Sequence, residues 1–244
     1  MLRHSTGTCA SAEEQERRGA QLSYDVYPLR TVSLPFINYT YIVVDSRTRQ
    51  GMLVDPAWDI QIITGKLKEL QVKVQGILLT HSHQDHVHLA SELTEIYGCA
   101  VYMSAIEVDD YGFRCKNLKK VYDRERLRFG ETTVTCIWTP GHTSGSMCYF
   151  LRECVFTGDT LFIEGCGGCQ FRGSSADQMF DSIQKIKASV TPDMRVFPGH
   201  SFGEAPGASF SHLYDRNIYV QLESRKHFVD FRMRPNQSQA YHFQ

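Results

Sequence analysis

The chain has 244 residues, of which 42% are hydrophobic and 22% are charged, so it can bury a sizeable core in one large domain or two small ones. Its formal net charge of -1 gives no electrostatic reason to expect nucleic acid or an anionic membrane as a partner. No apolar stretch approaches the roughly 18 residues of a membrane span, and the polar N-terminus lacks the apolar core of a signal peptide. We therefore expect a cytoplasmic protein.

The first half of the chain alternates β-rich runs with helical patterns. The runs YDVYPLRTV, NYTYIVV and QGMLVD predict strands. Helices are predicted over 59–70, with Asp59 as the cap, and over 89–98, with Ile96 on the apolar stripe and Gly98 at the end. Between them, the continuous apolar run VQGILLT predicts a strand buried on both faces, and AVYM predicts a further strand.

The second half repeats this pattern. TTVTCIW, SMCYFL, CVFTG and MRVFPGH predict strands, and SADQMFDSIQKIKA predicts a helix. Strands mixed with single helices in two comparable halves predict an α/β fold, in which two sheets pack face to face with helices outside. We expect one folded domain over 24–234, between a polar tail at 1–23 and a second tail at 235–244.

Residues 77–90, ILLTHSHQDHVHLA, hold four of the ten histidines directly after the buried strand. His81 and His83 are two apart, so they project the same way from extended backbone, and a turn after them can bring Asp85 and His86 nearby. Imidazole and carboxylate together suit zinc, iron or manganese. A solvated loop that happens to be rich in histidine is the alternative, but this pattern at a strand end favours a metal site.

Three later segments each place a further metal-capable residue just after a strand-like run. IWTPGHTSGS carries His142, CVFTGDTLF carries Asp159, and VFPGHSFGE carries His200. A glycine stands beside each of these residues, which allows close approach of the backbone. Together with the first loop, these side chains are enough for two metals that share a carboxylate.

The order H-x-H-x-D-H, G-H-T, T-G-D-T and P-G-H resembles the metallo-β-lactamase superfamily, and specifically its glyoxalase II-like branch, over residues 24–234. The resemblance implies a four-layer αβ/βα sandwich with the metal site at one edge between the sheets. It also implies a first metal held by His81, His83 and His142, a second held by Asp85, His86 and His200, and Asp159 as the bridge between them.

The resemblance further implies a metal-dependent hydrolase with two Zn²⁺ per chain, although iron or manganese can be held by the same ligands. Metal coordination lowers the pKa of water toward ~7 and prepares it for attack on an acyl carbonyl. Asp85 is expected to act catalytically as well, by orienting that water or relaying its proton.

The acyl substrate is harder to predict. In glyoxalase II relatives a basic residue that binds glutathione follows the segment GCG, but this chain has Gly168 there and Arg172 four residues on. The long helical C-terminal domain of glyoxalase II, which contacts glutathione, is also expected to be absent, since 44 residues follow His200. We predict that Gly168, Phe171 and Arg172 contact the substrate.

The segments YPLRTVSLPFINYTYIVVD and GHSFGEAPGASFSHLYDRNIYVQLESRKHFVDFRMRPN resemble the zinc-dependent hydrolases of bacterial trans-acyltransferase polyketide biosynthesis. This resemblance implies a thioesterase that releases acyl groups from acyl carrier proteins, and hence a role in antibiotic biosynthesis. A basic cluster, Arg225, Lys226, Arg232 and Arg234, is either a solvated helix face or a patch that steers an acidic carrier protein.

Other functions are kept as alternatives. Hydroxyacylglutathione hydrolysis is the first, and a persulfide dioxygenase-like enzyme or a non-catalytic metal-binding module follows. Neutral charge disfavours a nuclease. The eight cysteines are expected to be small buried thiols, and Cys166 and Cys169 to be structural despite their C-x-x-C spacing.

Overall fold

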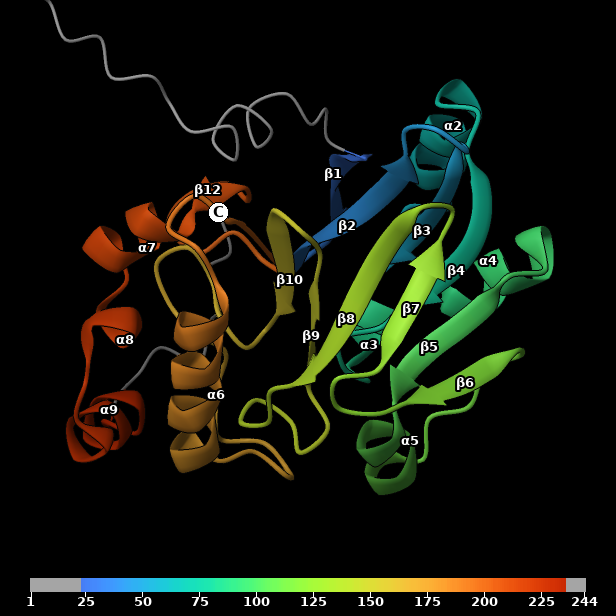
Figure 1. Ribbon diagram of the computed structural model, residues 1–244. Coiled ribbons are helices and arrows are strands. Elements are labelled where there is room, and N and C mark those ends of the chain that lie inside the picture. The colour runs from blue at the N-terminus through green and yellow to red at the C-terminus, as the bar shows by residue number, and fades with distance from the viewer. Residues whose placement is uncertain (1–22, 236–244) are drawn as a thin grey trace, which may run out of the picture.

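The computed structural model describes residues 23–235 and contains two six-stranded sheets that pack face to face (Figure 1). Sheet A holds, in spatial order, β1 (Tyr24–Ser33), β2 (Phe36–Asp45), β3 (Gln50–Val54), β4 (Lys73–Leu78), β5 (Ala100–Ser104) and β6 (Leu118–Val121). Sheet B holds β12 (Ala208–Ser209), β11 (Arg195–Pro198), β10 (Cys154–Gly158), β9 (Met147–Phe150), β8 (Thr132–Trp138) and β7 (Arg126–Phe129).

Helices cover the outer face of each sheet (Figure 1). Those on sheet A are α2 (Ile60–Glu69), α4 (Ala90–Tyr97) and α5 (Ala105–Tyr111), and the short α3 (Gln84–Val87) lies in the loop after β4. Those on sheet B are α6 (Ala176–Ser189), α7 (Phe210–Arg216), α8 (Ile218–Gln221) and α9 (Arg225–Arg232). The layers confirm the predicted αβ/βα sandwich.

The central strands are apolar on both faces because each face lies against a different core. In β2, Tyr41 and Val43 point into the core between the sheets, whereas Ile42 and Val44 pack under the helices of sheet A. The ring of Tyr41 lies 5.1 Å from Phe156 of sheet B, centroid to centroid. This double burial explains why the predicted strands read as continuous apolar runs.

Most predicted elements are confirmed, and their ends have the expected chemistry. The Asp59 side chain accepts a hydrogen bond from the amide of Ile62 and caps α2, and Gly98 ends α4 with φ 65°. The prediction that Ile96 lies on the buried apolar stripe of this helix was wrong, since its side chain is 54% exposed. α5, β6 and β7 were not predicted.

The four residues of the predicted basic cluster make contacts within the fold. Arg225 forms an ion pair with Asp181, and Lys226 pairs with Asp230. Arg232 is buried, and Arg234 lies over the ring of Phe231 at 4.0 Å from its centroid. These contacts are those of helix packing and of a solvated face, so they give no support to a steering patch.

The cysteines of the described residues are all free, and six of the seven are buried. Cys166 and Cys169 pack in the core under α6, as expected for structural thiols. Within residues 23–235 no helix combines the length and apolar character needed to cross a membrane. The predicted tails lie outside the described residues, apart from Ser23 and Pro235.

Asp45, at the end of β2, links a turn of sheet A to a turn of sheet B. Its buried carboxylate accepts hydrogen bonds from the amide and hydroxyl of Thr48, at 2.8 and 2.7 Å, in the β2–β3 turn. It also accepts from the amide of Glu131 and the hydroxyl of Thr132, at 3.0 and 2.9 Å, in the β7–β8 turn. Burial raises the pKa of Asp45, but the hydrogen bonds from these residues outweigh it and lower the pKa to about 2.

We expect Asp45→Asn to lower the free energy of unfolding at pH 7 by about 2 kcal/mol, because an amide nitrogen replaces an acceptor that two donors share. The folded-state pKa of about 2 lies below the ordinary value of 3.8. The stabilisation is therefore full above about pH 4 and is lost as the pH falls toward about 2. Urea unfolding at pH 7 and near pH 2 measures this difference in the free energy of unfolding, with the exposed Asp25→Asn as control. Equal effects of the two substitutions would contradict the role of Asp45.

Candidate metal centre

The seven residues predicted as metal ligands lie together at one edge of the sandwich, where the two sheets meet. His81 and His83 follow β4 of sheet A, and His142, Asp159 and His200 follow three strands of sheet B. β10 and β11 are parallel, and β8 is antiparallel to β9, which is antiparallel to β10, so these strands of sheet B end at the same edge. The strand-end positions that the sequence shows are therefore brought to one place.

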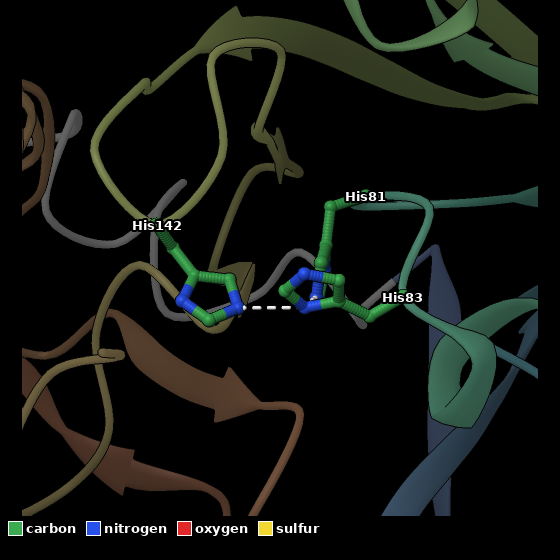
Figure 2. Close-up of side chains that lie close together, drawn as sticks. All are labelled: His81, His83 and His142. Carbon is green, nitrogen blue, oxygen red and sulfur yellow. Dashed lines mark hydrogen bonds between the residues drawn. The ribbon is translucent and has the colours of Figure 1, made fainter. Parts of the chain in front are cut away.

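The donor atoms form overlapping groups in which all atoms lie within 4.8 Å of one another. In the first, His83 Nδ1 lies 3.0 Å from both His81 Nε2 and His142 Nε2, and Figure 2 shows the three rings. In the second, His200 Nε2 lies 3.3 Å from His86 Nε2 and 3.3 Å from Asp85 Oδ2. These are the two ligand sets that the family resemblance implies.

Asp159 lies between the two groups. Its Oδ2 is 3.6 Å from His142 Nε2 of the first group and 3.5 Å from His200 Nε2 of the second. Its Oδ1 is 3.4 Å from His86 Nε2 and has no hydrogen-bond partner, although it is buried. A buried carboxylate oxygen without a donor is costly unless a cation satisfies it.

Four of the histidines are held with one particular nitrogen facing the cluster. The Nδ1 atoms of His142 and His200 donate to the carbonyls of Gly168 and Ile37, at 2.8 and 2.7 Å. Because a carbonyl only accepts, the proton resides on Nδ1 and Nε2 is left free as a ligand atom.

Asp55 fixes the other two histidines, His86 directly and His81 through Thr80. Its Oδ2 accepts from His86 Nδ1 at 2.9 Å and from the Thr80 hydroxyl at 2.6 Å. Since that hydroxyl donates to Asp55, it accepts from His81 Nδ1, which lies 3.0 Å away. The Nε2 atoms of both rings therefore face the cluster unprotonated when it holds a metal.

The first group favours neutral imidazoles. Burial lowers the pKa of His81 and of His83, and it lowers the pKa of His142 to about 4. Neutral imidazole is the form that binds a metal.

The second group concentrates negative charge. Burial alone lowers the pKa of His86 and His200, but the carboxylates of Asp85 and Asp159 outweigh it and raise these pKa values to about 9 and about 10. Burial also opposes ionisation of both carboxyl groups, yet the neighbouring histidines hold their pKa values well below the usual range. The carboxylates thus attract positive charge to this point.

The donor set fits divalent metal ions. Ligand atoms on a tetrahedron with metal–nitrogen bonds of about 2.05 Å lie roughly 3.3 Å apart, which is close to the separations within both groups. A Cβ atom at Gly199 would stand 2.4 Å from His86 Cε1 and 2.6 Å from Asp159 Oδ1, so only glycine leaves this space open. The residues present therefore fit a two-metal centre, with imidazole and carboxylate ligands that suit zinc, iron or manganese.

Residues that sequence reasoning missed orient the ligands. Asp55 is one, and Asn38 is another, because its amide donates to Asp85 Oδ2 at 3.0 Å and to the Asp85 carbonyl at 2.8 Å. The indole of Trp58 donates to the Asn38 oxygen at 2.7 Å and fixes that amide. Asp55 directly follows β3, at a strand end like those of the candidate ligands, but a single acidic residue at such a position does not by itself indicate a role.

The three predicted substrate contacts lie in different surroundings. The Gly168 carbonyl accepts from His142 and so supports a ligand. Phe171 lies edge-on to the rings of His83 and His142, with centroids 5.6 Å apart in both cases. Arg172 is turned toward α5, where its guanidinium donates to the Asp110 carbonyl at 3.2 Å.

Exposed phenylalanines from separate segments lie beside the cluster or stack on residues that support it, and we call them the apolar rim: Phe36, Phe171 and Phe202. Phe36 stacks on Trp58 at 6.0 Å, which contacts Asn38. Phe202 stacks on Phe162 at 6.1 Å, and Phe162 lies 6.0 Å from His200. Exposed fractions of 40 to 43% leave the surfaces of the three phenylalanines available to a ligand.

Comparison with known proteins gives close relatives. Residues 34–200 match the Metallo-beta-lactamase superfamily. PksB of Bacillus subtilis, named "Probable polyketide biosynthesis zinc-dependent hydrolase", is 48% identical over 222 residues, which cover 91% of this chain and 99% of PksB. BaeB of Bacillus velezensis, with the same description, is 51% identical over 221 residues, which cover 91% of this chain and 98% of BaeB.

More distant proteins share the same region. A hydroxyacylglutathione hydrolase-like protein of Gallus gallus is 33% identical over 180 residues, which cover 70% of this chain and 61% of that protein. The crystal structure of ETHE1 from Myxococcus xanthus has a TM-score of 0.75 at 27% identity and covers 88% of this chain and 93% of that one. With its fold, its motifs and these matches in agreement, the chain belongs to the metallo-beta-lactamase superfamily.

Proposed function

We propose that this chain is a zinc-dependent hydrolase that cleaves acyl thioesters of phosphopantetheine in polyketide biosynthesis. The names of PksB and BaeB support zinc-dependent hydrolysis and this biosynthetic setting. The acyl-pantetheine substrate, the two Zn²⁺ ions and a cytoplasmic location are parts of the proposal. An acyl carrier protein is proposed as the bearer of the thioester, with docking that does not rely on the basic cluster.

The roles of the residues follow from their placement. His81, His83 and His142 would hold one metal, Asp85, His86 and His200 the other, and Asp159 would contact both. A metal bound there would lower the pKa of water toward ~7 and would polarise an acyl carbonyl. Asp85 is held by Asn38 with its Oδ2 facing the cluster, so it can orient the attacking water and accept its proton.

The apolar rim is the observation that carries the choice of substrate. Glutathione bears charged carboxylates, which need cationic partners when they leave water. In the segment that carries Phe171, the Gly168 carbonyl is turned to His142, and the Arg172 guanidinium lies over Tyr111 at 5.9 Å from the ring centroid. Exposed phenylalanine rings instead suit an uncharged acyl chain, at roughly 25 cal/mol per Å² buried.

Hydroxyacylglutathione hydrolysis is the second candidate, and the relative in Gallus gallus favours it. It requires the same metal centre and differs only in the carrier of the acyl group. A persulfide dioxygenase-like enzyme or a non-catalytic metal-binding module lacks a comparable observation in its favour.

We expect the zinc-loaded protein to hydrolyse lactoyl-pantetheine faster than S-lactoylglutathione, and octanoyl-pantetheine at least about tenfold faster than acetyl-pantetheine in kcat/KM. Phe171→Ala should reduce the octanoyl preference, because its ring is part of the apolar rim. Tyr122→Ala removes an exposed ring that lies outside this rim and serves as the control. Faster cleavage of S-lactoylglutathione would instead favour the second candidate.

A further inference from the structure

Glu107 is a fully buried carboxylate that joins the two loops of the first ligand group. Its Oε1 accepts from the amide and the hydroxyl of Ser82, both at 2.7 Å, and Ser82 lies between His81 and His83. Its Oε2 accepts from the Thr143 hydroxyl at 2.8 Å, and Thr143 follows His142. One side chain therefore contacts both ligand-bearing loops without contacting a ligand ring in these hydrogen bonds.

The local sequence predicts a different role for Glu107, that of a helix cap. Ser104 and Glu107 have the S-x-x-E spacing of a helix capping box at the start of α5. The Ser104 side chain accepts from the Glu107 amide and so forms half of the box. The Glu107 carboxylate, which would complete it, is turned to Ser82 and Thr143 instead. Helix capping does not account for where this charge is placed.

Tight packing holds the second loop against the same residue. A Cβ atom at Gly145 would lie 2.3 Å from the Glu107 amide nitrogen and 2.6 Å from its Cα, so the backbone of the His142 loop rests directly on α5. Thr143 also shares a hydrogen bond of 2.7 Å with Ser146. The loop therefore has little room to shift while these contacts persist.

We propose that Glu107 is a positioning residue, which locks the His81–His83 loop to the His142 loop so that the first ligand group is assembled before the metal binds. The inference rests on the metal centre of the proposed function and not on the choice of acyl substrate. A preorganised ligand group binds its metal more tightly because less ordering remains to be done on binding.

The test measures Zn²⁺ affinity by chelator competition and the absorption spectrum of the Co²⁺-substituted protein. We expect Glu107→Ala to weaken the first metal by about 10- to 100-fold and to alter the Co²⁺ spectrum. Glu107→Gln should retain affinity within a few fold, since its oxygen still accepts from Ser82 and the Thr143 hydroxyl can rotate to accept from its amide. Asp109→Asn, an exposed charge on the same helix, should leave both readouts unchanged.

Thr143→Val removes the link to the second loop together with the hydrogen bond to Ser146, and it carries the test if Glu107→Ala does not fold. Its loss of affinity should be non-additive with that of Glu107→Ala. Wild-type affinity in Glu107→Ala, an equal loss in Glu107→Gln, or additive losses would each overturn the inference. If the wild type itself bound no metal, the proposed function would fail first, so the two failures are distinguishable.

Discussion

Replacing Asp159 by alanine is expected to lower kcat/KM for the preferred thioester by at least about a thousandfold and to reduce the bound zinc. Asp159 contacts both ligand groups, and its Oδ1 is a buried acceptor that no donor satisfies. Metal-ion stabilisation of the developing charge is worth several kcal/mol, and roughly 4 kcal/mol corresponds to a factor of about a thousand.

Zinc content by mass spectrometry and steady-state kinetics on the same samples measure this effect. Asp193→Ala, in the exposed turn before β11, is the matched control and should retain zinc and activity. Thermal unfolding of the metal-free proteins separates loss of a ligand from loss of the fold. An Asp159→Ala protein that keeps wild-type activity would contradict the two-metal proposal.

That the seven candidate ligands lie together could be predicted because each one follows a strand, and strand ends are readable in a single sequence. The H-x-H-x-D-H segment comes after a run that is buried on both faces, and the other three follow β8, β10 and β11. Neighbouring strands that run the same way then bring these positions to one edge. The division of these residues into two ligand groups is what the family resemblance implies.

The supporting residues could not be predicted, because their partners are remote in the sequence. Asp55 contacts Thr80, 25 positions on, and Glu107 contacts Thr143, 36 positions on. A single acidic residue after a strand, or one at a helix start, has a common local explanation in each case. Only the folded arrangement shows that these carboxylates serve the histidine loops.

Short-range patterns failed where tertiary contacts decide the outcome. β6 and β7 have four residues each, too few to establish a period of two. The basic residues of the α9 segment read either as a solvated helix face or as a steering patch, and the pairing that bears on this choice is set by the fold, as Asp181 of α6 is for Arg225. Composition gives the charge of a segment and not its pairing.

Asp55→Asn is expected to weaken zinc binding by about a hundredfold or more while the fold is retained. The Asp55 backbone has φ 47°, a left-handed conformation that asparagine tolerates. The Thr80 amide, 2.8 Å from Asp55 Oδ1, can only donate, so the asparagine oxygen must stay there. Its NH₂ group then faces the Thr80 hydroxyl and His86 Nδ1, where the carboxylate had accepted from both.

This exchange reverses the direction of two hydrogen bonds. His86 Nδ1 must accept, which moves the proton to Nε2, the atom that faces the cluster. The Thr80 hydroxyl now accepts from asparagine and turns its proton to His81 Nδ1, so the second ring is reversed in the same way. Each reversed imidazole presents a proton where a ligand lone pair is needed, and loss of such outer partners typically costs 10–100-fold in affinity.

Chelator competition measures the affinity, and ¹⁵N chemical shifts of the imidazoles at high pH report which nitrogen carries the proton. Asp59→Asn is the matched control, since asparagine caps α2 as well as aspartate does. Asp55→Ala should in addition lower the free energy of unfolding by roughly 3 kcal/mol, because it leaves buried donors unpaired. If Asp55→Asn binds zinc as the wild type does, Asp55 supports the fold alone, and the orientation of His81 and His86 must be set by the metal ions themselves.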